Sequence, residues 1–208
     1  DPALDPDGTV RDMALDSPLV RTSETLRGYA LPSFAPGTPV AVAAIDLCTR
    51  IHRDFTYRPG ATTIATGVDE VLARGEGVCQ DFAHLAVACL RALGLPARYV
   101  SGYLETQPPP GQPKLQGADA SHAWAAVFVP GPGPGSVGGA AGDGWWLEID
   151  PTNDAVPDDR YIVTAWGRDY SDVTPIKGVL YSAGSNQELV VAVDVVPLSP
   201  SLETAHQG

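Results

Sequence analysis

The sequence predicts an α+β fold, in which helices come first and an antiparallel β-sheet follows. Apolar residues recur at helical spacing before residue 95, and segments rich in β-branched and aromatic residues come after it. This segregation along the chain is typical of an α+β domain. At 208 residues with 44% hydrophobic content, the chain can bury one sizeable core. We therefore expect a single domain over residues 1–208, with a lead-in segment at 1–37, a core at 38–170 and C-terminal strands at 171–208.

The lead-in segment and the first helix are predicted from breaks and periodicity. The lead-in contains several prolines and no sustained apolar period, so we expect it to wrap over the domain. Thr38 is the expected N-cap of the first helix, with Pro39 at its first position. The apolar stripe of this helix comprises Ala44, Leu47, Cys48, Ile51 and Phe55. The stripe makes Cys48 a core residue.

Two more helices are expected before the sheet. Thr66 and Asp69 have the spacing of a capping box ahead of a short helix that Gly75 can end. The main helix starts at Cys79, directly after the stretch GEGV, and closes at Gly94. Its shared face comprises Cys79, Phe82, Ala86, Cys89 and Leu93.

Five later segments have the composition of strands. They are RYVSGYL (98–104), HAWAAVFV (122–129), WWLEID (145–150), VLY (179–181) and ELVVAVDVV (188–196). The Gly- and Pro-rich residues 130–144 connect the second and third of these segments as a long hairpin loop.

The net charge of −12 and the pI near 4.5 argue against an anionic binding partner. Nucleic acids and anionic membranes are bound by clustered Lys and Arg, and this chain has only 13 such residues. No apolar run reaches the length of a membrane span, and the stretch DPALDPDGTV lacks the features of a secretory signal. We therefore expect a cytoplasmic protein that binds neither nucleic acid nor membrane. A first residue that is Asp rather than Met also suggests a fragment of a longer protein.

Three cysteines cannot form a complete disulfide framework, which favours a reducing compartment. Cys79 and Cys89 lie on one predicted helix about 15 Å apart along its axis, too far to share a disulfide or a metal ion. His84, between them, points about 140° away from Cys79. We therefore predict neither a metal site nor a cofactor.

Cys79 is the candidate nucleophile. Unpaired N–H groups and the helix dipole favour a thiolate at a helix start, and the same N–H groups can face an oxyanion. A thiolate nucleophile also requires a base and a group that orients the base. His122 begins one predicted strand and Asp150 ends the next, so antiparallel pairing would bring the two within hydrogen-bond reach. Glu148 and Asp119 are alternatives to Asp150 for the orienting role.

Three further residues are weaker candidates for the site. Tyr57 and Gln80 are candidates for the second oxyanion donor, with a core or helix-surface role as the alternative. Trp124 shares the His122 face of its strand, so it either forms a wall of the substrate cleft or packs in the core. Asp81, in the first turn of the main helix, is expected to stabilise the helix start.

Three sequence blocks resemble the transglutaminase-like superfamily. They are GVCQDFAHL with Cys79, ASHAW with His122 and EIDPTN with Asp150. They are similar to a bacterial branch described as cysteine proteases, and flanking stretches extend the similarity over residues 39–197. The resemblance implies a papain-like fold with a catalytic core, and many members carry a β-rich domain before that core. The loop at residues 130–144 departs from the family, in which a tight turn is expected.

The residues and the resemblance together predict a cysteine enzyme that acts on a protein or peptide. Cys79 would attack a carboxamide or peptide carbonyl, form a thioester, and pass the acyl group to water or to an amine. A binding or scaffolding module on the same fold is the alternative. The absence of a G-x-S-x-G stretch disfavours a serine hydrolase. Because the sequence also lacks a D-x-[DN]-x-[DN]-G loop, we expect calcium-independent activity, with hydrolysis favoured over cross-linking.

Overall fold

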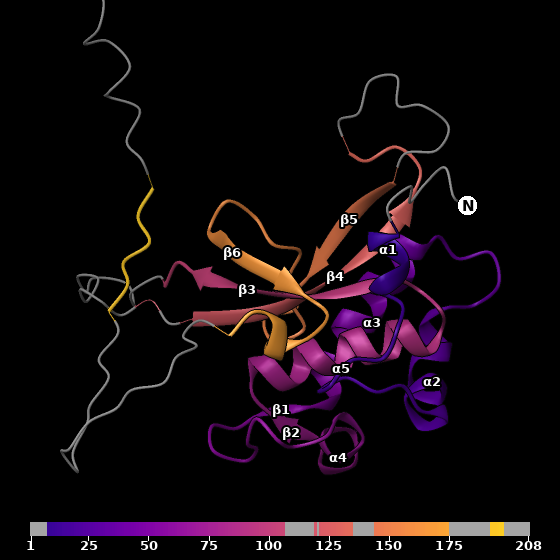
Figure 1. The fold of residues 1–208 in the computed structure, drawn as a ribbon, viewed down its shortest axis with the longest axis horizontal. Helices are drawn as coiled ribbons and strands as arrows, with labels where there is room; N and C mark the ends of the chain where they lie inside the picture. Colours follow the sequence, from indigo (N-terminus) through magenta and orange to yellow (C-terminus); the bar gives the residue numbers. More distant parts are fainter. Residues whose placement is uncertain (1–7, 107–118, 120, 135–143, 175–191, 198–208) are drawn as a thin grey trace, which may run out of the picture.

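The computed structural model describes residues 8–106, 119, 121–134, 144–174 and 192–197, and it has the predicted α+β architecture (Figure 1). The helices are α1 (Thr9–Asp12), α2 (Glu24–Ala30), α3 (Val40–Asp54), α4 (Val68–Arg74) and α5 (Cys79–Ala92), with 3-10 turns η1 (Leu31–Ser33) and η2 (Tyr170–Asp172). The strands are β1 (Thr56–Tyr57), β2 (Glu76–Gly77), β3 (Ala97–Leu104), β4 (Ser121–Pro130), β5 (Gly144–Ile149) and β6 (Tyr161–Gly167).

Helix α5 forms the centre of the core. It lies between the sheet strands β3 and β4 on one side and helices α2 and α4 on the other (Figure 1). Every residue from Asp81 to Arg91 is buried, which fits a helix covered on all sides. The stripe predicted for α3 is buried in the same apolar cluster, Cys48 included. None of the described helices has both the length and the apolar character needed to cross a membrane.

The lead-in segment packs on the core through short helices that the sequence pattern did not predict. Ser23 is the N-cap of helix α2, and its hydroxyl accepts the N–H of Leu26 at 3.2 Å. The buried Arg91 of α5 binds the segment that precedes α2. Its Nε donates to the Met13 carbonyl at 2.8 Å, and its Nη1 donates to the Ser17 hydroxyl at 3.2 Å. Helices α1 and α2, of four and seven residues, have too few turns to show an apolar period in sequence, whereas α4, also of seven residues, was predicted from the glycine that ends it.

Two of the predicted helix caps are wrong. Helix α3 has Pro39 as its N-cap rather than Thr38, because Pro39 keeps a non-helical ψ of 139°. Helix α4 follows Gly67, and no capping box forms between Thr66 and Asp69. Instead, the Thr66 hydroxyl accepts a backbone N–H within its own turn, and Asp69 accepts a hydroxyl from the lead-in segment.

The two glycines before α5 have separate structural reasons. Gly75 ends α4 in the left-handed conformation, with φ of 68°, as predicted. Gly77 lies against Asp81, and a Cβ at Gly77 would lie 2.8 Å from Asp81 Oδ2. This oxygen accepts the Val78 N–H at 2.8 Å, so Asp81 stabilises the helix start as predicted. The stretch GEGV therefore leads into α5 with Cys79 as its first residue.

The main sheet is antiparallel, with strand order β5-β4-β3-β6. Strands β4 and β5 pair as predicted, with Ala125 opposite Ile149, and this register brings the end of β5 beside the start of β4. Strand β6 was not predicted. Its residues YIVTAWG have the β-branched and aromatic composition of a strand but no alternation of apolar and polar residues, and its middle residues are exposed or half-buried.

Most of the C-terminal strands predicted from sequence lie outside the described residues. The segment 179–181 lies outside them, as does the first part of 188–196. Residues 192–197 are described and form no strand. Here the Val195 N–H donates to the Asp119 carboxylate at 2.6 Å, and the Val193 carbonyl accepts the Asp119 N–H at 3.2 Å, so Asp119 binds this stretch at two positions.

Candidate active site

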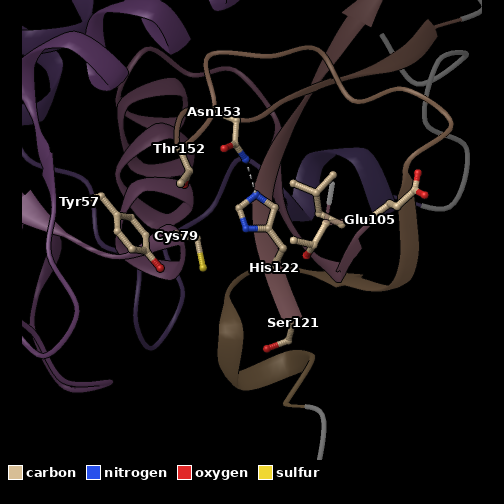
Figure 2. Close-up of a pocket in the computed structure, with 9 residues that line it drawn as sticks. Tyr57, Cys79, Glu105, Ser121, His122, Thr152 and Asn153 are labelled. Carbon is tan, nitrogen blue, oxygen red and sulfur yellow. Dashed lines mark hydrogen bonds between the residues drawn. The ribbon is translucent and has the colours of Figure 1, made fainter. Parts of the chain in front are cut away.

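A cavity of about 510 Å³ opens where the start of α5 meets the ends of the strands (Figure 2). Helix α5 contributes Cys79, β4 contributes His122, β1 contributes Tyr57, and the segment after β5 contributes Asn153. The structure thus places residues from four separated parts of the chain around one cavity.

His122 and Asp150 form a buried hydrogen-bonded pair. The His122 Nε2 lies 2.7 Å from Asp150 Oδ2, and the His122 side chain is 10% exposed while Asp150 is fully buried. Burial lowers the pKa of His122, but hydrogen bonds with Asp150 and Cys79 outweigh burial and raise this pKa to about 9. Burial raises the pKa of Asp150, but its bonds with His122 and two neighbours hold it below the ordinary value. The ionised pair is therefore favoured at neutral pH.

Cys79 lies on the opposite side of the imidazole ring. Figure 2 shows the thiol and the second ring nitrogen of His122, Nδ1, turned toward each other, and a Cys79 hydrogen bond contributes to the raised pKa of His122. Cys79 is half-buried and lines the cavity. Cys48 and Cys89 are buried, and burial raises the pKa of each to about 12. Cys79 is thus the accessible thiol of the three.

Three groups besides His122 donate hydrogen bonds to the Asp150 carboxylate. The Tyr161 hydroxyl donates to Oδ2 at 2.8 Å, the Asn153 amide donates to Oδ2 at 2.6 Å, and the Thr152 N–H donates to Oδ1 at 2.9 Å. Sequence reasoning gave none of them a role. Asn153 stands in the block EIDPTN, which was the available signal, whereas Tyr161 lies on the unpredicted strand β6.

The other two candidates for the orienting role lie elsewhere. Glu148 accepts the indole N–H of Trp124 at 2.8 Å, and Asp119 accepts the Thr106 N–H at 2.6 Å. Neither carboxylate is bonded to His122. Of the three acidic residues considered, Asp150 is the one that the structure brings to the imidazole.

Trp124 is not a wall of the cavity. Its side chain is fully buried behind His122, and the two rings stack with centroids 5.9 Å apart at 28°. Gly102 on β3 leaves room for the indole, since a Cβ at this glycine would lie 2.6 Å from Trp124 Cη2. The sequence placed Trp124 on the correct face of its strand, but the alternation of a strand does not show what covers that face.

Tyr57 and Gln80 differ in their relation to Cys79. The parallel pairing of β1 with β2 places Tyr57 opposite Gly77, and Tyr57 lines the cavity with its hydroxyl directed toward Cys79 (Figure 2). Burial, and then the proximity of Cys79, raise the pKa of Tyr57, which favours the neutral hydroxyl. Gln80 is half-buried and is not among the described residues that line the cavity.

Two other histidines have structural partners. His84 accepts the Tyr170 N–H at 3.1 Å, and burial lowers its pKa to about 4. His52 Nδ1 lies 3.0 Å from the carbonyl oxygen of Thr152, beside the site. Within the part of the chain that the structure describes, no group of three or more His, Cys, Asp or Glu residues has the arrangement of a metal site.

A family model and two relatives are similar to this chain in sequence. A family model described as the transglutaminase-like superfamily matches residues 30–151. An uncharacterized protein of Mycobacterium tuberculosis is 51% identical over 196 residues, which are 94% of this chain and 60% of that protein. A protein-glutamine gamma-glutamyltransferase of Pseudomonas aeruginosa is 34% identical over 128 residues, which are 60% of this chain and 17% of that protein.

Among solved structures, a proposed cysteine protease from Cytophaga hutchinsonii matches with a TM-score of 0.63 and 28% identity. The match covers 84% of this chain and 52% of that one. The chain therefore spans 60% or less of the length of these relatives.

Proposed function

Because the chain belongs to the transglutaminase-like superfamily and has its papain-like fold, we propose that it is a cysteine enzyme acting on a protein or peptide. The observation that carries the proposal is that Cys79 faces the ring of His122, which is hydrogen-bonded to the buried Asp150, at the wall of a cavity. A nucleophile, a base and an orienting group in this order are the parts needed for nucleophilic acyl transfer.

In the first step, the Cys79 thiolate attacks the carbonyl carbon of a carboxamide or peptide bond. With a pKa of about 9, His122 carries the proton at neutral pH, and the imidazolium next to Cys79 favours the thiolate as the attacking form. The carbon–nitrogen bond breaks as His122 Nδ1 gives its proton to the departing amine or ammonia. A thioester on Cys79 and a neutral His122 remain.

The oxyanion of the tetrahedral intermediate requires donors next to Cys79. The first hydrogen bond of α5 runs from the Phe82 N–H to the Val78 carbonyl, so the N–H of Cys79 has no acceptor within the helix. The Tyr57 hydroxyl is the second donor in this scheme, because it lines the cavity and is directed toward Cys79. Gln80 is the weaker candidate since it lies outside the cavity lining.

In the second step, neutral His122 takes a proton from the acyl acceptor, which attacks the thioester and releases the thiolate. Water is the acceptor in hydrolysis, and a primary amine is the acceptor in cross-linking. The cavity is open, and bulk water is present at about 55 M, so an amine competes only if a site binds and orients it. We therefore favour hydrolysis of a peptide bond or a glutamine amide.

Amine transfer is the second candidate. The relative named protein-glutamine gamma-glutamyltransferase favours it, and such an activity would use the same first step. The two candidates differ only in the acceptor.

The test is to incubate the purified protein with casein and a fluorescent primary amine, with and without EDTA. We expect release of ammonia or new peptide termini, little incorporation of the amine, and no effect of EDTA. Cys79→Ala should remove the activity and Cys48→Ala should not. Robust incorporation of the amine would establish cross-linking instead, and equal activity of Cys79→Ala and the parent protein would refute both candidates.

A further inference from the structure

Asp150 carries more hydrogen bonds than the orientation of one imidazole requires. Oδ1 accepts the Thr152 N–H at 2.9 Å, and Oδ2 accepts from His122 at 2.7 Å, Tyr161 at 2.8 Å and Asn153 at 2.6 Å. Because the residue is fully buried, these donors replace its solvation by water. Three of them converge on the oxygen that contacts His122.

Tyr161 reaches this oxygen from a distant part of the sheet. It lies on β6, at the opposite edge of the sheet from β5, after which Asp150 follows. Its ring packs at 6.2 Å from the His122 ring and edge-on at 5.4 Å from Trp124. The hydroxyl is therefore fixed by packing against the same imidazole whose carboxylate partner it binds.

Asn153 approaches from the cavity side. Its amide nitrogen lies 2.6 Å from Asp150 Oδ2 and 3.3 Å from His122 Nε2 (Figure 2). Because an ionised carboxylate only accepts hydrogen bonds, the amide presents its nitrogen, and not its oxygen, to Oδ2. Asn153 is exposed, so it lies over the His122–Asp150 hydrogen bond on the side open to solvent.

We propose that Tyr161 and Asn153 are positioning residues, which fix the Asp150 carboxylate from two sides and so hold the His122 ring toward Cys79. The inference rests on the proposed function, since it assigns these residues to the same site. Loss of either donor leaves the carboxylate freer to rotate and less stabilised as an anion. A less stabilised anion attracts the imidazolium proton more strongly, while the looser geometry slows the chemical step.

The test compares Tyr161→Phe and Asn153→Ala with the parent protein. Tyr29→Phe is the matched control, because Tyr29 donates to the Asp54 carboxylate at 3.0 Å and neither residue is among the described residues that line the cavity. We would follow the His122 ring by NMR from pH 5 to 10, the rate of Cys79 alkylation by iodoacetamide over the same range, and kcat and KM on any substrate found.

We expect both site variants to move the His122 titration to higher pH by about half a unit and to lower kcat about tenfold with little change in KM. The control should change none of these. A titration and an alkylation profile unchanged in both variants would overturn the inference even if turnover continues. A shifted titration without any turnover would uphold it and would count only against the proposed function. If Tyr161→Phe does not fold, the exposed Asn153→Ala decides.

Discussion

Replacing Asp150 with Asn removes the charge that keeps His122 protonated and leaves the size of the side chain unchanged. The Asp150 hydrogen bond and charge are principal causes that raise the pKa of His122 from 6.5 to about 9 against the effect of burial. Without the carboxylate, burial lowers this pKa and Cys79 raises it, so we take the ordinary value of 6.5 as the endpoint.

The expected magnitude follows from these two values. At pH 7.5, His122 is roughly 97% protonated with a pKa of 9 and roughly 9% protonated with a pKa of 6.5, so the imidazolium population falls about tenfold. The two proteins therefore differ in His122 charge between about pH 6.5 and pH 9, since both carry the imidazolium well below pH 6.5 and both lose it as the pH rises through about 9. The alkaline limb of any activity that needs the imidazolium should therefore move from near pH 9 toward pH 6.5.

Iodoacetamide labelling of Cys79 between pH 5 and 10, read by mass spectrometry, tests this change without knowledge of the substrate. The reactivity of the thiol depends on the charge of the His122 ring next to it. The buried Cys48 and Cys89 are internal controls in the same digest. If the labelling profile of Asp150→Asn matched that of the parent protein across this range, Asp150 would not be the group that sets the charge of His122.

Three further outcomes follow from the structure. Cys79 should be labelled by iodoacetamide well before the buried Cys89 at neutral pH, and faster labelling of Cys89 would exclude Cys79 as the nucleophile. Cys79→Ala should melt close to the parent protein, because a small residue fits the first turn of a helix. Gly77→Ala should lower the free energy of unfolding by about 1–3 kcal/mol in urea denaturation, since its Cβ would lie 2.8 Å from Asp81 Oδ2; an unchanged value would show that the helix start adapts. Replacement of residues 131–142, which lie partly outside the described residues, by a tight turn should preserve melting and thiol reactivity, and loss of both would show that the loop builds the site.

The parts of the site that could be predicted are those whose position depends on local sequence. A glycine-rich turn followed by a helical apolar period places Cys79 at a helix start, whatever the rest of the chain does. The hairpin of β4 and β5 joins consecutive strands, so the proximity of His122 and Asp150 follows from pairing neighbours in the chain. The order of the helices and of the strands β3, β4 and β5 was predictable because each of these elements is marked by its own local sequence.

The parts that could not be predicted depend on how separated elements meet. Tyr161 binds Asp150 only because β6 pairs with β3, so that its ring crosses the face of the sheet to reach His122 and Trp124. The composition YIVTAWG is typical of a strand, but it does not show which strand β6 pairs with, and a tyrosine hydroxyl has no fixed partner until the sheet is assembled. The same holds for Trp124, whose burial follows from the space left by Gly102 on the next strand. Local sequence therefore identifies the candidates Cys79, His122 and Asp150, whereas the bond from Tyr161 to Asp150 depends on the pairing of β6 with β3 and is found only in the structure.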